Sequence, residues 1–382
     1  MSKANKKIKI VIAPDSFKGS ISAQDAALAI EKGLRSSVKK GIELITVISP
    51  IADGGEGTLD ALTSEDQRIS VEVTSTNGKT VLAQYGAVGN TAIIEMARAA
   101  GLTLTPENER DASLATTFGV GELILDALDR GYRSIMLTVG GSGTNDGGCG
   151  MFSCLGALFS DEDKKSFVPT GATLDRICDI DISHLDKRLY GCEFIIATDV
   201  KNVLCGSTGA TYVYGRQKGA DNELLDKMEK GMIHYASLLK EKCGKDIASI
   251  EGCGAGGGLA SPLLAFLNAR IQSGIGAVLD TIGFDKLISD ADAIITGEGK
   301  IDAQSLYGKA ISGVTGAAKK YGVPVYCFVG CIGGDKKELL TLGISDIYAL
   351  SDIAPSPEHS MTHADELLEK LGKNFAENIE NL

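Results

Sequence analysis

Three segments of this sequence share one pattern, in which a short apolar run ends in glycines and carboxylates and a helical pattern follows. They span residues 52–58, 140–148 and 296–302. A buried apolar strand, a loop and a helix form the repeating unit of α/β proteins. Because open α/β sheets bind ligands beyond the carboxyl ends of their strands, we expect these loops to meet a ligand. Glycine, at 47 of 382 residues, is abundant enough for such loops.

Regular α/β alternation occupies both ends of the chain. At the start, the apolar run 8–13 is followed by a helical pattern that Ser22 and Asp25 can cap and by a second strand over 43–49. Near the other end, strand and helix patterns alternate again from about residue 291. Both stretches predict parallel sheet.

The middle of the chain follows a different pattern. The runs 69–73 and 81–87 alternate apolar and polar residues around Asn77-Gly78, which is a strong hairpin signal. Antiparallel pairing does not belong to a doubly wound core. We therefore predict that residues 1–68 and 284–382 form one parallel-sheet domain, and that residues 69–283 form an inserted α/β domain with antiparallel elements.

The glycines and carboxylates of the three loops suit a phosphorylated ligand with a metal ion. Glycine lets backbone N–H groups close on phosphate oxygens, and helix dipoles favour the negative charge. An Asp aimed at a polyphosphate would repel it unless Mg²⁺ lay between them. A single loop of this kind is more often a plain turn with a solvated carboxylate, but three together favour the phosphate site.

Two further loops follow predicted strands. Residues 14–20 place Lys18 beside Asp15, where the lysine could reach a carboxylate or phosphate, although a salt bridge between the two explains the pair almost as well. Asp199 follows the strand 193–198. Both loops are therefore candidate parts of the same site.

Composition narrows the classes of function. The formal net charge is −12, and the sequence has no long basic run, which argues against a nucleic-acid surface. Nine cysteines without a Cys-x-x-Cys pair indicate reduced thiols in a cytoplasmic protein. The apolar run 8–13 is too short for a membrane span or a signal peptide.

One motif supports a competing interpretation. Gly252, Gly254 and Gly257 match the dinucleotide-binding fingerprint, and Asp280 lies near the expected spacing beyond them. The segment before them, 247–251, is a weak strand. A nicotinamide-dependent hydroxyacid oxidoreductase is accordingly the alternative hypothesis.

The loops together resemble the glycerate kinase family of bacteria, type 1. The likeness runs from about residue 8 to 330 and is carried by five segments in the family's order: 14–18, 52–58, 144–148, 217–220 and 296–299. The resemblance implies ATP-dependent phosphorylation of glycerate and a flavodoxin-like domain built from both chain ends. It also implies an inserted second domain and an active cleft between the two.

The resemblance supports these loops as parts of the site, and we divide the roles among their residues as follows. Asp199 is the predicted general base and, with Lys18, the predicted catalytic pair. Lys18 would face the glycerate carboxylate. The predicted substrate-binding residues are Asp15, Ser16, Lys18, Asp53, Gly54, Gly55 and Glu56; the phosphate-binding residues are Gly141, Ser142, Gly143, Thr144, Asn145, Gly297 and Gly299; and the Mg²⁺ ligands are Asp146, Glu298 and Asp302.

The expected partners are therefore glycerate and ATP with Mg²⁺, without nucleic acid or membrane, in a monomer or homodimer. The 2-hydroxyl is the favoured acceptor and the 3-hydroxyl the alternative. A metabolite-binding protein without turnover would use the same loops. ADP release in proportion to glycerate distinguishes the kinase from that protein and from the oxidoreductase.

Overall fold

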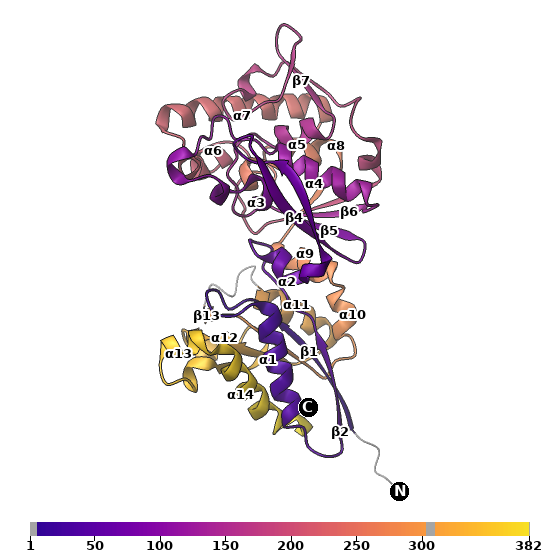
Figure 1. The fold of residues 1–382 in the computed structure, drawn as a ribbon, viewed down its shortest axis with the longest axis vertical. Helices are drawn as coiled ribbons and strands as arrows, with labels where there is room; N and C mark the ends of the chain where they lie inside the picture. Colours follow the sequence, from indigo (N-terminus) through magenta and orange to yellow (C-terminus); the bar gives the residue numbers. More distant parts are fainter. Residues whose placement is uncertain (1–5, 303–309, 382) are drawn as a thin grey trace. The chain divides into compact units, whose positions relative to one another are not determined.

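The computed structural model describes residues 6–302 and 310–381. The chain divides into two compact units (Figure 1). Unit 1 combines Met1–Asp53 with Gly274–Leu382, and unit 2 is Gly54–Ser273. Each unit has a sheet and a hydrophobic core of its own.

Unit 1 is built on a five-stranded parallel sheet in the order β2-β1-β12-β14-β16. Counted along this unit the order is 2-1-3-4-5, which defines the flavodoxin-like fold. The strands are β1 (Lys6–Pro14), β2 (Ile42–Ile48), β12 (Ala293–Gly297), β14 (Val325–Val329) and β16 (Ile344–Ala349). The fold class predicted from the sequence is therefore confirmed.

Helices α1 (Ala23–Ser36) and α14 (Ala364–Ala376) run side by side in this unit (Figure 1). Ser22 caps α1 as predicted, because its side chain accepts a hydrogen bond from the Asp25 N–H. Gly33 is the point of closest approach, since a Cβ there would lie 2.1 Å from the Glu369 carbonyl oxygen. Because Gly33 has no side chain, α14 can pack directly against α1.

The other helices of unit 1 are short or follow a strand. They are α9 (Gly274–Thr281), α10 (Phe284–Ile288), α11 (Ala310–Tyr321), α12 (Lys336–Leu340) and α13 (Pro357–Thr362). Helix α11 packs on β12 and β14 and also contacts α9 and α10. A small parallel pair, β13 (Lys300–Asp302) with β15 (Cys331–Gly333), lies just beyond β12 and β14 in the chain.

Unit 2 contains a six-stranded mixed sheet in the order β11-β10-β6-β5-β4-β3. Its strands are β3 (Arg68–Thr74), β4 (Thr80–Val88), β5 (Thr91–Glu95), β6 (Ser134–Thr138), β10 (Glu193–Ala197) and β11 (Arg270–Gln272). The predicted hairpin is present, because β3 and β4 pair antiparallel around the turn at Asn77-Gly78. The remaining neighbours from β5 to β11 are parallel.

Seven helices of unit 2 surround this sheet within the described residues: α2 (Thr58–Leu62), α3 (Ala97–Ala100), α4 (Phe118–Asp129), α5 (Cys149–Cys154), α6 (Ala210–Tyr214), α7 (Asn222–Cys243) and α8 (Ser261–Phe266). A small antiparallel sheet adds β7 (Leu158–Ser160), β8 (Ser166–Phe167) and β9 (Asp179–Asp181). Helix α7 is the longest of these helices, at 22 residues.

The boundaries between the two units lie at 53/54 and 273/274. Both are earlier in the chain than the predicted boundaries at 68/69 and 283/284. Helix α2 belongs to unit 2 because it packs on β4 and β5. Helix α9 belongs to unit 1 because it packs on α10 and α11. Short helices next to a boundary carry no signal in the sequence that says which core will bury them.

Candidate active site

A cavity of about 610 Å³ lies at the carboxyl edge of the unit 1 sheet. Its walls come from the loops that follow β1, β12, β14 and β16 and from Asp53. Seven residues predicted from the sequence line it: Asp15, Ser16, Lys18, Asp53, Glu298, Gly299 and Asp302. The structure thus brings together segments that lie nearly 300 residues apart in the chain, because β1 and β12 are neighbours in the sheet.

Asp15 is the buried acid of this cavity, with only 8% of the residue exposed. Its Oδ1 accepts a hydrogen bond of 2.6 Å from the Ser16 N–H. Burial raises the pKa of Asp15 to about 7; the charges of Asp53 and Glu298 act in the same direction, and the Ser16 N–H and Lys18 oppose the rise. A carboxyl group that titrates near neutral pH in a cavity can exchange a proton with a ligand.

Lys18 extends from the same loop into solvent, with 82% of its side chain exposed. Its Nζ lies 3.9 Å from Asp53 Oδ2, which is the limit of an ion pair. A pair this long and exposed contributes little to stability. The ammonium group can therefore turn to a ligand carboxylate at small cost.

The arrangement of the carboxylates in the cavity indicates which kind of metal site they could form. Within the described residues, no three His, Cys, Asp or Glu side chains converge on one point. An ion held entirely by protein side chains does not fit that arrangement. Mg²⁺ bound to a nucleotide does fit, because it takes one or two carboxylates and completes its shell with phosphate oxygens and water.

Packing explains one of the two predicted phosphate-binding glycines in unit 1. A Cβ at Gly297 would lie 1.8 Å from the Phe328 carbonyl oxygen on the neighbouring strand. The Gly297 carbonyl also accepts the Asp15 N–H at 2.8 Å. At Gly299 a Cβ would make only ordinary contacts, the nearest 3.5 Å from Phe17 Cα. Of the two, only Gly299 lines the cavity.

The sequence analysis missed the part of the wall that comes from the C-terminal region. Leu350, Ser351, Ser360 and Met361 line the cavity, together with Phe17 from the first loop. Residues 350–361 have no glycine and carboxylate pattern that would single them out. Only the strand order, which places the loop after β16 at the same edge, identifies them.

The glycine loop after β6 contacts the loop 54–58 inside unit 2. Gly141 has a φ of +67°, and a Cβ there would lie 1.7 Å from Glu56 Oε1. The Glu56 carboxylate thus occupies the space that a side chain at Gly141 would need. Two loops that the sequence predicted for one site are adjacent, although Glu56 and Gly141 lie far apart in the chain.

Backbone N–H groups of the 140–148 loop differ in their partners. The Gly143 N–H donates to the Ala100 carbonyl at 2.8 Å. In the described ranges, the N–H groups of Gly141, Ser142 and Thr144 have no acceptor. The buried side-chain oxygens Thr144 Oγ1 and Asn145 Oδ1 have no partner there either. Gly141 is exposed and Ser142 half-buried, whereas Thr144 and Asn145 are buried, where polar groups are normally bonded; these two residues therefore have unused hydrogen-bonding capacity.

Asp146 lies in the interior of the loop. Its side chain is fully buried, and its two oxygens accept hydrogen bonds from the N–H groups of Thr117, Gly148 and Gly150 and from the Thr117 hydroxyl. Burial raises the pKa of Asp146 despite these bonds. The carboxylate joins the start of α4 to the start of α5. This arrangement favours a structural role over the predicted coordination of Mg²⁺.

Asp199 follows β10, as the sequence predicted, and is exposed. The adjacent turn is closed by the Val200 N–H, which donates to Thr198 Oγ1 at 3.2 Å. Asp199 does not line the unit 1 cavity.

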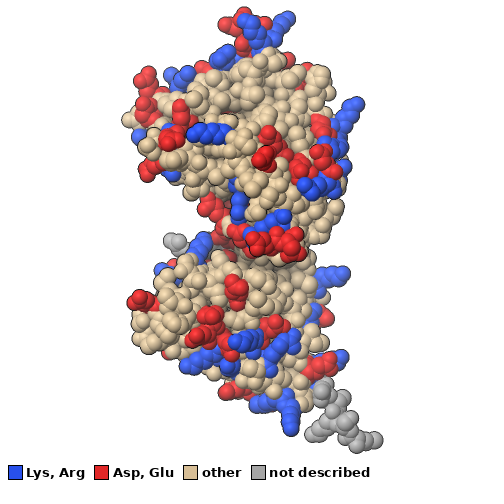
Figure 2. All heavy atoms as spheres, viewed as in Figure 1, with Lys and Arg blue, Asp and Glu red and all other residues tan. Residues whose placement is uncertain are grey.

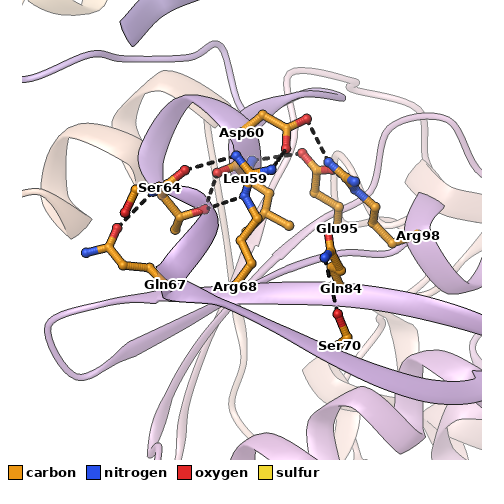
Figure 3. Close-up of polar contacts among 10 residues, drawn as sticks. Leu59, Asp60, Ser64, Gln67, Arg68, Ser70, Gln84, Glu95 and Arg98 are labelled. Carbon is orange, nitrogen blue, oxygen red and sulfur yellow. Dashed lines mark hydrogen bonds and ion pairs between the residues drawn. The ribbon is translucent and has the colours of Figure 1, made fainter.

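An ion-pair network holds α2 and the loop before it against the sheet (Figure 3). Glu95, at the end of β5, is buried and accepts the Leu59 N–H at 2.9 Å. Arg98 bridges Glu95 and Asp60 at 3.0 and 2.7 Å, and Arg68 contacts Asp60 at 2.9 Å. No sequence motif predicts this network, which anchors the helix that follows Glu56.

The Gly252 cluster does not have the surroundings that dinucleotide binding requires. The fingerprint needs a strand before it and a helix opened by it. Residues 248–254 form turns and a bend, and Ala255–Gly257 is a single 3-10 turn. A Cβ at Gly257 would lie 2.0 Å from the Thr144 carbonyl oxygen, so packing inside unit 2 accounts for this glycine. The glycine motif that favoured the oxidoreductase hypothesis therefore does not have the structure of a dinucleotide-binding site.

Acidic and basic side chains are mixed on the face of the molecule shown in Figure 2. That view shows no broad basic patch over either unit. No helix in the described part of the chain is long and apolar enough to span a membrane.

A flavodoxin-like sheet with a cavity at its carboxyl edge and an acid with a near-neutral pKa in that cavity is the arrangement typical of α/β enzymes that act on small molecules. A profile of the glycerate kinase family matches residues 10–380. The chain therefore belongs to the glycerate kinase family.

Individual relatives agree with that membership. The chain is 42% identical to the glycerate kinase of Halalkalibacterium halodurans, over 96% of this chain and 97% of the relative. It is 42% identical to the glycerate 2-kinase of Escherichia coli, over 90% of each chain. A crystal structure provisionally named glycerate kinase 2, from Salmonella typhimurium, is 38% identical and superposes with a TM-score of 0.86, covering 98% of this chain and 99% of the other.

Proposed function

We propose that this enzyme uses ATP to phosphorylate the 2-hydroxyl of glycerate. The observation that carries the proposal is the unit 1 cavity, in which a near-neutral acid, an exposed lysine and further carboxylates meet. The name of the Escherichia coli relative supports the 2-hydroxyl over the 3-hydroxyl. The five matching segments support the type 1 group, and nine free cysteines support a cytoplasmic location.

Glycerate binding is assigned to the segments 15–18 and 53–56. The Lys18 ammonium group pairs with the glycerate carboxylate, because its only ion pair in the described residues is long and exposed. Asp15, Ser16 and Asp53 bind the hydroxyl groups of the substrate. Gly54, Gly55 and Glu56 complete the assigned segment.

Phosphate binding is assigned to Gly141, Ser142, Gly143, Thr144 and Asn145, and to Gly297 and Gly299. The unused N–H groups of Gly141, Ser142 and Thr144 support the first set. Glu298 and Asp302 would hold the Mg²⁺ of the nucleotide, which neutralises charge on the phosphates. We do not assign Asp146 to the metal, because its oxygens are already engaged.

The reaction needs one proton acceptor. The 2-hydroxyl oxygen forms a bond to the γ-phosphorus, the bond from that phosphorus to ADP breaks, and the hydroxyl proton passes to a carboxylate. Asp199 is the predicted base. Asp15 is the second candidate, and its pKa of about 7 favours it for a reaction at neutral pH.

The test is the identity of the product. Purified enzyme is incubated with ATP, Mg²⁺ and D- or L-glycerate, ADP release is followed, and the product is examined by phosphorus NMR. We expect ADP in proportion to glycerate and the resonance of 2-phosphoglycerate. The 3-phosphoglycerate resonance would refute the 2-hydroxyl assignment, and the absence of glycerate-dependent ADP would refute the kinase.

A further inference from the structure

A second cavity, of about 630 Å³, lies within unit 2. It is bordered by the hairpin turn after β3, the segment 101–118, Gly143 and Lys218. Strand β3 is parallel to β5 and β6, because two antiparallel pairings separate it from β5. The cavity therefore lies at the carboxyl edge of its sheet, where α/β folds bind ligands. Apart from Gly143, none of its residues has been assigned a role above.

Two cations line this cavity. Lys218 is 1% exposed, and its Nζ donates one hydrogen bond of 2.6 Å to the Thr144 carbonyl. Arg110 is half-buried and reaches the Thr105 and Gln217 carbonyls only at 3.4 Å. Among the described residues, neither cation forms an ion pair.

Neither side chain therefore has a counter-charge in direct contact. Glu109 and Asp111 also line the cavity, but both are exposed. Burial lowers the pKa of Lys218 to about 7, and the charge of the buried Asp146 opposes this shift without forming an ion pair with Lys218. Two of the three Nζ donors of Lys218 remain for a ligand. An anionic group between Arg110 and Lys218 would accept charge-assisted hydrogen bonds from both side chains.

The rest of the wall suits a flat, partly apolar group that carries hydroxyls. Leu114 and Val168 are large apolar side chains with 64% and 45% of the residue exposed, and both border the cavity. Leu102 and Phe118 extend the apolar surface. Five threonines also line it: Thr74, Thr76, Thr105, Thr116 and Thr170. The volume falls in the range of small-molecule sites, as does that of the unit 1 cavity, so the side chains of the walls rather than the volumes distinguish the two cavities.

We propose that this unit 2 cavity binds the nucleotide, with the base against Leu102, Leu114 and Val168 and the phosphates toward Arg110 and Lys218. The inference rests on the proposed function, since it names where that activity would hold ATP. Gly143, which lines this cavity, belongs to the phosphate-binding loop 141–145, so that loop extends the same phosphate site.

The experiment measures ADP binding by calorimetry in the full-length enzyme with Mg²⁺. Arg110→Ala should weaken ADP binding by roughly tenfold or more, the usual effect of a lost charged hydrogen bond. Leu114→Trp should do the same by filling the mouth of the cavity, and its exposed position leaves the fold intact. Arg270→Ala is the matched control, because this arginine is exposed and pairs with Glu193 away from the cavity. Thermal melts verify that each variant is folded.

The outcomes separate the two proposals. Unchanged ADP affinity in the folded Arg110→Ala and Leu114→Trp proteins overturns the nucleotide site. A rise in KM for glycerate with unchanged ADP affinity also overturns it and makes the cavity an acid site. Wild-type protein that binds ADP but forms no phosphoglycerate refutes the proposed function, while loss of ADP binding in the variants would still support the cavity.

Discussion

At the residue scale, the most informative group is Asp15, whose carboxyl holds its proton in the folded protein to about pH 7. A raised pKa contributes stability that is present below the unfolded value of 3.8 and lost as pH rises through 7. Asp15→Asn keeps the neutral shape, so in EDTA the variant should gain melting temperature over wild type, and more at pH 8 than at pH 5. Asp163→Asn, on an exposed side chain, is the control. An equal difference at both pH values would contradict the raised pKa.

Replacing Lys18 tests whether this residue binds the carboxylate of glycerate. Lys18→Ala should raise the KM for glycerate about tenfold, because a charged hydrogen bond contributes roughly 1.5–3 kcal/mol. Steady-state kinetics gives the result. Lys32→Ala, which removes an exposed lysine paired with Glu369, should leave KM unchanged. An unaltered KM in the Lys18 variant would remove this residue from the site.

The kcat values of variants at Asp199 and Asp15 distinguish the two candidate bases. If Asp199 is the base, Asp199→Asn should lower kcat by about 10² to 10⁴ with the KM for ATP within a few-fold, the usual effect of losing a general base. Recovery of the rate at high Mg²⁺ would instead indicate a metal ligand. A near-normal kcat would transfer the role to Asp15, and Asp15→Asn should then show the loss.

At the scale of elements, the contact between α1 and α14 depends on one missing side chain. Gly33→Ala would place a Cβ 2.1 Å from the Glu369 carbonyl oxygen, so one helix must shift. We expect a loss of about 1–3 kcal/mol in the free energy of unfolding, the usual cost of overpacking. Urea unfolding measures it. Gly316→Ala, on the exposed face of α11 with open space around it, should instead stabilise by about 0.5–1 kcal/mol. A stable Gly33→Ala protein would show that the helices can separate freely.

At the scale of the whole molecule, the division into units makes its own prediction. Residues 54–273 contain a complete sheet and a large buried core. Expressed alone, this segment should fold and melt cooperatively, as followed by circular dichroism and calorimetry. The segment 69–283, divided as the sequence suggested, lacks α2 and the ion pairs of Asp60, and should melt at a lower temperature. The reverse order would contradict the observed boundaries.

The sequence could predict part of the fold and part of the candidate site. The strand and loop patterns around Asp15, Asp53 and Glu298 predicted a parallel α/β sheet and seven residues of the unit 1 cavity, because parallel strands must end at one edge; the flavodoxin-like order came from the family resemblance. The Leu350–Met361 wall and the unit 2 cavity could not be predicted, since their residues become neighbours only through strand order. The buried state of Asp146 was also invisible, because a loop carboxylate has the same sequence signature whether it binds a ligand or its own backbone.

The strand order of unit 1 also dictates a sequence of events during synthesis. Strand β1 needs β12 as a neighbour, but the ribosome completes all of unit 2 before β12 emerges. At about 5–20 residues per second, the N-terminal strands wait on the order of tens of seconds with apolar edges unpaired. The charged ends of β1 and β2, with Lys6, Lys7 and Glu43, give these strands some protection from pairing with other nascent chains. The middle of the chain can therefore fold first, and the two ends complete the sheet of unit 1 only after the C-terminal segment has been made.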